Sequence, residues 1–322
     1  MPKGPVTSLD ECDSLYDVLT GSTSIDEKRR AVAGLLGAHQ AINFELGRGR
    51  PFWRARKCSP DGYTSEREVS YPPPDRTDSG RMNDKGDPCL YLSTRKETAF
   101  AEIGAIEGDY VHVAGYRVQA NQAIRALGIG EWLHVQKTGY MRTMGQDPGN
   151  SLSHILNSFP HEQGTLILYI DALLSSILAD PEAGKNRYET TRLIAAMTHK
   201  KVPSANAIFY PSVQATLGMN LAVKAKAADM CMHNVCSIVA RILKVRKFGV
   251  YEFEVCKTAT GVNDAGQFEW QEPESPRSLN LYRLTKSEYE AGGNSILELR
   301  SEHVARPRSL GQRLKDAFHA FR

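Results

Sequence analysis

The segment over residues 80–102 constrains the fold more than any other part of the chain. It begins with a glycine-flanked turn that carries Arg81, continues into an apolar run in which Tyr91 stands between two leucines, and ends on helix-forming residues that include Glu102. Because successive side chains of a strand point to opposite faces, Tyr91 should face away from both leucines. The segment therefore predicts a turn, a short strand over 89–92 and a helix in direct succession.

The remaining sequence indicates helices and strands that do not alternate regularly. Ser24 and Glu27 form a capping box before a predicted helix that runs to about Leu46. Residues 57–79 are turn-rich and contain three consecutive prolines, which predicts a long loop of the kind that often covers a functional site. Further helices are expected over 94–106 and 186–200, and strands over 51–56, 110–118, 165–169, 208–212, 238–245 and 250–255.

This mixture of short strands and interspersed helices predicts an α+β fold. The common dinucleotide-binding fold requires a strand, a Gly-x-Gly-x-x-Gly turn and a helix. The nearest match, Gly128-Ile-Gly130, lacks the third glycine and a correctly spaced acidic residue, so that fold is disfavoured. The sequence also lacks a phosphate-binding Gly-Lys-Ser/Thr loop, a His-Glu-x-x-His motif and a Gly-x-Ser-x-Gly elbow.

Bulk composition excludes several classes of protein. A chain of 322 residues fits one large domain with attachments or two modest domains. The 40 basic and 37 acidic residues nearly balance, so neither direct nucleic-acid binding nor membrane-surface binding is expected. No apolar run approaches the roughly 18–20 residues that cross a bilayer. The first residues lack the pattern of a signal peptide, and we expect a cytoplasmic protein.

The cysteines and one histidine are candidates for metal or redox chemistry. Six cysteines are scattered through the chain, which does not indicate a disulfide framework. Cys231, His233 and Cys236 could supply three metal ligands, but their spacing matches no common zinc pattern, so we interpret them as packed residues and expect no metal site. His39 lies on the apolar face of the predicted N-terminal helix and is interpreted as a core-edge residue. That face should pack on the main domain or on a second subunit.

Arg81, Tyr91 and Glu102 together suit the cleavage of an N-glycosidic bond to nicotinamide. Such a reaction passes through a ribose with oxocarbenium character, which a neighbouring carboxylate stabilises. An arginine binds a pyrophosphate through its planar fork of donors, and an aromatic ring positions the leaving group. Each residue also has an ordinary structural interpretation: a turn arginine, a core aromatic and a solvated helix carboxylate.

Three stretches of the sequence resemble the RES domain, which is named for its arginine, glutamate and serine. The central stretch departs from the family at Met82, where an aromatic residue is usual. The resemblance spans residues 50 to 255, with its pieces in the expected order. The stretches are Phe52-Trp53-Arg54, the run from Gly80-Arg81-Met82-Asn83 through Leu-Tyr91-Leu-Ser to Ala99-x-x-Glu102, and Tyr210-Pro211-Ser212-Val-Gln214 followed by Asn220.

The resemblance implies an ADP-ribosyltransferase-like split β-sheet core with surrounding helices. It divides the chain into an N-terminal helical extension (1–50), a RES-like catalytic domain (51–256) and a C-terminal polar extension (257–322) with a basic amphipathic tail over 309–322. NAD⁺ would be the substrate, with no prosthetic group. Family members are toxins that deplete NAD⁺ by phosphorolysis or hydrolysis, and an Xre-type antitoxin blocks their cleft.

The resemblance also implies roles for individual residues. Arg81 would bind the NAD⁺ phosphates, Tyr91 would line the nicotinamide side, and Glu102 would stabilise the ribosyl cation. Ser212 would donate a hydrogen bond in the pocket. Further contacts with NAD⁺ are expected from Arg54, Asn83 and Asn220.

Three functions share these residues, and the sequence leaves all three open. The first is an NAD⁺-consuming enzyme, with phosphate or water as the acceptor. The second is a mono-ADP-ribosyltransferase that modifies a protein target. The third is a non-catalytic NAD-binding module that retains the fold. The acceptor, the oligomeric state and the existence of an antitoxin partner are not determined by the sequence.

Overall fold

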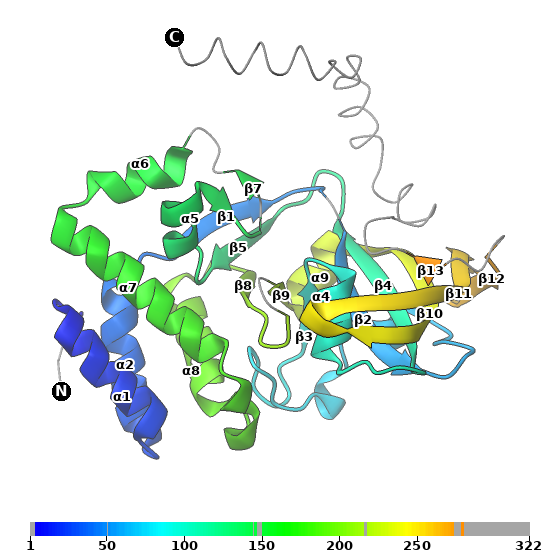
Figure 1. Ribbon diagram of the computed structural model, residues 1–322, viewed down its shortest axis with the longest axis horizontal. Coiled ribbons are helices and arrows are strands. Elements are labelled where there is room, and N and C mark those ends of the chain that lie inside the picture. Colours follow the sequence, from blue (N-terminus) through cyan, green and yellow to red (C-terminus); the bar gives the residue numbers. More distant parts are fainter. Residues whose placement is uncertain are drawn as a thin grey trace, which may run out of the picture. The chain divides into compact units, whose positions relative to one another are not determined.

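Figure 1 shows the computed structural model, which describes residues 4–49, 51–143, 145–146, 150–215, 218–273 and 278–279. Its strands are β1 (Ile42–Leu46), β2 (Phe52–Cys58), β3 (Cys89–Ser93), β4 (Tyr110–Val118), β5 (Ile124–Gly128), β6 (Tyr140–Met141), β7 (Gly145–Gln146), β8 (Ala207–Pro211), β9 (Met219–Lys224), β10 (Met232–Arg246), β11 (Val250–Val262), β12 (Phe268–Gln271) and β13 (Ser278–Leu279). Its α-helices are α1 (Leu9–Gly21), α2 (Ile25–Ala38), α3 (Glu66–Val69), α4 (Lys96–Glu102), α5 (Trp132–Thr138), α6 (Ser151–Ser158), α7 (His161–Leu178), α8 (Glu189–Lys201) and α9 (Ala225–Cys231). Short 3-10 turns are η1 (Pro74–Arg76), η3 (Pro181–Asn186) and η4 (Lys247–Gly249).

A large mixed sheet organises the fold and confirms the expected combination of helices and strands. Its strands lie in the order β1-β5-β8-β9-β3-β2-β4-β10-β11-β12, with β13 beside β11. Neighbouring strands are antiparallel except β5 and β8, which are parallel. Because β5 and β8 run in the same direction, the loops that follow them leave from the same edge of the sheet.

The sheet is nearly divided in its middle, where β3 meets β2. Only one residue pair, Trp53 with Ser93, registers across this junction. By contrast, β2 and β4 register over seven consecutive pairs, from Phe52 to Cys58. The sheet therefore consists of two halves, β1-β5-β8-β9-β3 and β2-β4-β10-β11-β12, which meet at a single pair.

Four helices pack together on one face of the first half-sheet. Figure 1 shows α1, α2, α7 and α8 side by side, and each contacts at least two of the others. Leu35 of α2, Leu174 of α7 and Ile194 of α8 are buried in one core cluster that also contains Tyr210 of β8. The apolar face of the N-terminal helix thus packs on the main body of the chain, one of the two expected arrangements.

The N-terminal helix is shorter than the sequence indicated. Ser24 caps it as expected, accepting a hydrogen bond from the Glu27 amide, but the helix ends at Ala38 rather than near Leu46. Residues 42–46 instead form β1, which pairs with β5. Buried residues four apart suit either a helix or a strand, and here pairing with an adjacent strand selects the strand.

The strand expected over 165–169 is wrong, because these residues lie within helix α7. Buried residues recur along this helix at Leu166, Ile170, Leu173 and Leu174, the spacing of one helical face. A short apolar window cannot distinguish a buried strand from a buried helix by its period alone. The full length of 18 residues is what identifies the helix.

The sheet extends past the expected end of the central domain. The boundary at 256 lies inside β11, and β12 follows over Phe268–Gln271. The basic tail expected over 309–322 lies outside the described residues. None of the described helices combines the length and the apolar character that a membrane span requires.

Candidate active site

Glu102 receives two side-chain hydrogen bonds from residues more than a hundred positions away. Its Oε1 accepts from the Ser212 hydroxyl at 2.6 Å and from the Asn220 side-chain amide at 2.7 Å. Glu102 is the last residue of α4, while Ser212 follows β8 and Asn220 lies in β9. These strands are antiparallel neighbours, so the structure brings all three predicted residues together, with Glu102 exposed and Asn220 buried beneath it.

The Asn220 amide is oriented by a residue that sequence analysis did not single out. The buried Ser93 hydroxyl donates to Asn220 Oδ1 at 2.7 Å. Ser93 and Asn220 are register partners on β3 and β9. With its oxygen occupied in this way, the amide presents its NH₂ group to Glu102. In the sequence, Ser93 stands two residues after Tyr91, on the same face of the strand, and closes the Leu-Tyr91-Leu-Ser part of the family resemblance, which gave it no role.

The Ser212 hydroxyl is also fixed in orientation. Its Oγ accepts hydrogen bonds from the backbone amides of Gln214 at 3.2 Å and Ala215 at 3.0 Å. Because these amides fill the acceptor positions of the hydroxyl, its proton is directed to Glu102. Two donors therefore hold one carboxylate oxygen. Within the described residues, the other oxygen of Glu102 has no hydrogen bond from the protein.

Tyr91 and Asn83 form a second group, which stabilises the turn before β3. The Tyr91 hydroxyl donates to Asn83 Oδ1 at 2.7 Å and accepts from the Met82 amide at 2.8 Å. Burial raises the pKa of Tyr91 well above its usual value. A Cβ on Gly80 would lie 2.7 Å from the Tyr91 hydroxyl, so the turn requires glycine there. The Tyr91 hydroxyl therefore holds the segment that carries Arg81.

Arg81 contacts the end of α7 and an aromatic ring. Its Nη1 donates to the carbonyl oxygens of Leu178 at 2.6 Å and Asp180 at 3.2 Å. Its guanidinium carbon lies 5.2 Å from the centre of the Tyr188 ring. Tyr188 adopts φ +59°, a left-handed backbone conformation that is unusual for a bulky residue. The chain thus accepts local strain at the position that places this ring against Arg81.

Tyr210 lies within electrostatic range of Glu102, of Tyr91 and of Arg81. It is buried at the end of β8, two residues before Ser212. Burial raises the pKa of Tyr210 well above its usual value, the charges of Tyr91 and Glu102 act in the same direction, and Arg81 opposes them. Arg81, Tyr91 and Glu102 therefore all lie within electrostatic range of one phenol. Tyr210 belongs to the stretch Tyr210-Pro211-Ser212 that carries the family resemblance, but that resemblance implies no role for its side chain.

Arg54 is not brought to this group. On β2, Arg54 shares a face with Phe52, whose register partner on β4 is Tyr116. Trp53 points to the opposite face, where the ammonium of Lys96 from α4 lies over its ring. The hydrogen bond of Arg54 runs from Nη1 to the backbone oxygen of Tyr91 at 3.2 Å, and burial lowers the pKa of its guanidinium.

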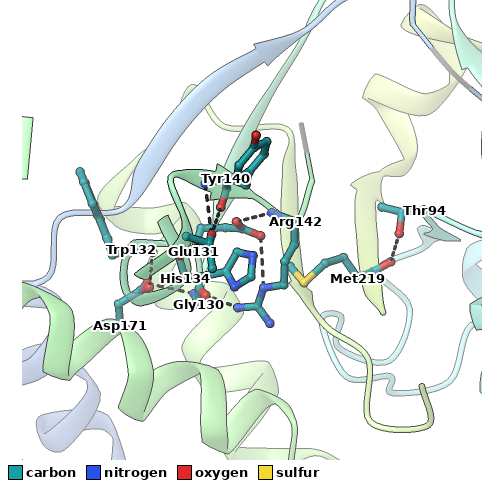
Figure 2. A network of polar contacts seen from close by, with 10 residues as sticks. Thr94, Gly130, Glu131, Trp132, His134, Tyr140, Arg142, Asp171 and Met219 are labelled. Atoms are coloured by element: carbon teal, nitrogen blue, oxygen red, sulfur yellow. Dashed lines mark hydrogen bonds and ion pairs between the residues drawn. The ribbon is translucent and has the colours of Figure 1, made fainter. Parts of the chain in front are cut away.

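A second polar network lies at the same edge of the sheet as Ser212 (Figure 2). Asp171 of α7 accepts from the backbone amides of Gly130 at 3.0 Å and Trp132 at 2.9 Å, and pairs with His39 Nε2 at 3.0 Å. Both side chains of the pair are buried, so His39 is a core residue that ties α2 to the loop after β5. This agrees with its interpretation as a structural histidine.

Glu131 is fully buried within this network. Its Oε2 accepts from the Arg142 backbone amide at 2.9 Å, and burial raises the pKa of its carboxyl to about 7. On the other side of Figure 2, the Thr94 hydroxyl donates to the backbone oxygen of Met219 at 3.2 Å. Among the described residues, no three His, Cys, Asp or Glu side chains gather as a metal site would require.

Fold and site together define a mixed α/β protein in which serine and asparagine side chains from neighbouring strands hold a helix-terminal carboxylate. The family model of the RES domain matches residues 51–245. Because that match covers more than half of the chain, the protein belongs to the RES domain family. Membership associates it with NAD-utilising, toxin-like enzymes. The comparisons with curated proteins and with solved structures each gave no match.

Proposed function

We propose that the protein consumes NAD⁺ by cleaving the bond between nicotinamide and ribose. The observation that carries the proposal is the Glu102 carboxylate, held through one oxygen by Ser212 and Asn220. In this proposal the other oxygen faces the ribose, where it stabilises the positive charge that develops as nicotinamide leaves. The nicotinamide ring of NAD⁺ is already cationic and leaves as a neutral molecule, so the reaction needs no strong general acid.

Arg81 supplies the anchor for the pyrophosphate in this proposal. A guanidinium has five N–H donors, and the carbonyls of Leu178 and Asp180 engage only Nη1. The remaining donors are available for a phosphate oxygen, with the Tyr188 ring supporting the guanidinium from one side. Tyr91 and Asn83 contribute by fixing the turn that carries Arg81, and Tyr91 also lines the nicotinamide side.

The near-division of the sheet supports an ADP-ribosyltransferase-like core. In the proposed arrangement, NAD⁺ lies along the α4 side of the junction between the half-sheets. The protein then acts as a toxin that depletes NAD⁺, with phosphate or water as the acceptor. An Xre-type antitoxin that covers Glu102 would be its inhibitor, and this partner is part of the proposal.

The decisive experiment incubates the purified full chain with NAD⁺, with and without inorganic phosphate, and identifies products by NMR. We expect free nicotinamide together with ADP-ribose-1″-phosphate or ADP-ribose. In Glu102→Gln, the rate should fall by about 10²–10³, the usual effect of losing a charge contact to a transition state. The matched control is Glu107→Gln, an exposed carboxylate outside the site, which should keep the wild-type rate.

Three results would contradict the proposal. Near-wild-type consumption of NAD⁺ by Glu102→Gln would remove the assigned role of the carboxylate. ADP-ribose attached to protein, with little free product, would identify a transferase instead. Absence of any turnover in the wild type, with NAD⁺ bound, would favour the non-catalytic module.

A further inference from the structure

A second pocket lies on the face of the sheet opposite to Glu102. It has a volume of about 570 Å³ and is bounded by the segment 66–74, by α9 and by the start of β10. Leu90 belongs to its lining, whereas Tyr91 faces the other side of β3. The volume is in the range of small-molecule sites, and the residues named for the proposed reaction do not line it.

Two polar groups that line this pocket lack hydrogen-bonding partners within the described part of the chain. They are the Tyr116 hydroxyl and the side-chain nitrogen of Asn234, and both atoms are buried. Arg54 contributes a third such atom, its Nε, on the same face of the sheet. Buried polar groups without partners are uncommon, because each forfeits its hydrogen bonds with water.

The surroundings of Tyr116 confirm that these groups lie close together. Burial raises the pKa of Tyr116 to about 12, while Arg54, Asn234 and Ser70 act in the opposite direction. Asn234 and Ser70 are thus near enough to the phenol to lower its pKa through their polar side chains. Within the described part of the chain, however, the Tyr116 hydroxyl and the Asn234 side-chain nitrogen make no hydrogen bond of standard length and angle. A hydroxyl and an amide NH₂ that belong to lining residues, with a guanidinium on the same face of the sheet, form a set of donors on this side of the fold.

The rest of the pocket is lined by apolar side chains and by charged side chains of both signs. Leu90 and Met232 provide apolar surface next to the donors. The carboxylates of Glu66 and Asp229 also line the pocket, and Asp229 accepts a hydrogen bond from the Tyr71 hydroxyl at 2.5 Å. Arg67 and His233 line the pocket as well, so the acidic side chains are accompanied by basic ones.

We propose that this pocket binds a small molecule in which a single carboxylate or carboxamide is attached to a ring-sized apolar body. The ligand oxygen accepts from the Tyr116 hydroxyl and the Asn234 amide, with the positive charge of Arg54 behind them. The apolar body contacts Leu90 and Met232. Binding here requires neither Glu102 nor NAD⁺, so the proposal is independent of the proposed reaction.

The test uses benzoate and benzamide as probes of the full-length protein without NAD⁺, with binding followed by saturation-transfer NMR and calorimetry. Tyr116→Phe deletes one donor and Asn234→Asp replaces the other by an acceptor. Each should weaken benzoate binding about tenfold or more.

Tyr71→Phe is the matched control, because its hydroxyl is already engaged by Asp229; affinity for benzoate should stay within about twofold. Tyr116→Phe removes a hydroxyl without a partner, so its melting temperature should not fall, which separates lost binding from lost folding. Glu102→Ala should bind benzoate as the wild type does. Absence of millimolar binding by both probes, or unchanged affinity in a folded Tyr116→Phe variant, would overturn the proposal.

Discussion

At the scale of single residues, hydrogen bonds determine how the Glu102 carboxylate is presented. Ser93 donates to Asn220, and Asn220 donates to Glu102. Ser93 does not touch the carboxylate and acts as a positioning residue. Without its hydroxyl, the Asn220 oxygen loses its donor, and the contact with the acceptor-only Glu102 carboxylate is the one in this set that still orients the amide.

We therefore expect Ser93→Ala to lower kcat for NAD⁺ consumption about tenfold, the effect of one lost hydrogen bond, while KM stays within about twofold. Ser93→Thr keeps the hydroxyl and should recover most of the rate. Steady-state kinetics of the three proteins test this. Equal kcat for Ser93→Ala and the wild type would show that the amide is oriented by other means.

The sequence indicated part of this site for a simple reason. Arg81, Tyr91 and Glu102 lie within one turn-strand-helix segment, where local periodicity gives both element and face. The roles of Ser93, Tyr188 and Tyr210 depend on which strands are neighbours and on a left-handed backbone residue. A single sequence does not encode these relations in a local pattern, so reasoning from spacing could not find them.

At the scale of secondary-structure elements, the buried Asp171 connects three parts of the fold. It accepts from two backbone amides after β5 and pairs with His39 at the end of α2. These contacts hold helix α7 to the edge of the sheet from which the Ser212 turn also leaves. Local sequence patterns predicted the wrong element at both neighbouring segments, 42–46 and 165–169. At the first segment, pairing with β5 selects a strand, and at the second, the full length of the apolar pattern selects a helix.

Replacing Asp171 by alanine should lower the free energy of unfolding by about 3–5 kcal/mol, since the change leaves buried partners unsatisfied. Urea denaturation measures this effect. Asp26→Ala, which removes an exposed ion pair with Arg29, should cost less than about 1 kcal/mol. A similar, small cost for both variants would mean that the Asp171 contacts contribute little to stability.

At the scale of the whole molecule, three groups that are wholly or partly buried make stability depend on pH. Burial lowers the pKa of His112 and of His199 to about 4, below the unfolded value of 6.5. The unfolded state binds more protons than the folded state between these values, so both groups raise stability as pH increases from 4 to 6.5. Glu131 has the opposite effect, because the pKa of its carboxyl is about 7 in the folded state and 4.5 in the unfolded state. The folded state therefore binds more protons between these values, and the stability that Glu131 contributes is lost as the pH rises from 4.5 to 7.

Glu131→Gln should isolate the opposing contribution. Relative to the wild type, the variant should gain stability steadily between pH 4.5 and 7, by about 3 kcal/mol in total, and then level off. Chemical denaturation at several pH values gives this difference directly, with the histidine contributions cancelling. A difference that does not change with pH would mean that Glu131 titrates alike in the folded and unfolded states.

The single residue pair that joins the two half-sheets has a mechanical consequence. Ser93 is one member of this pair, opposite Trp53, and its hydroxyl donates a hydrogen bond to Asn220. Any shear of one half-sheet against the other is therefore concentrated at the residue that sets the hydrogen bonding of Glu102. A force or a binding partner that displaced the halves by a fraction of a bond length would act on the Glu102 carboxylate without touching it.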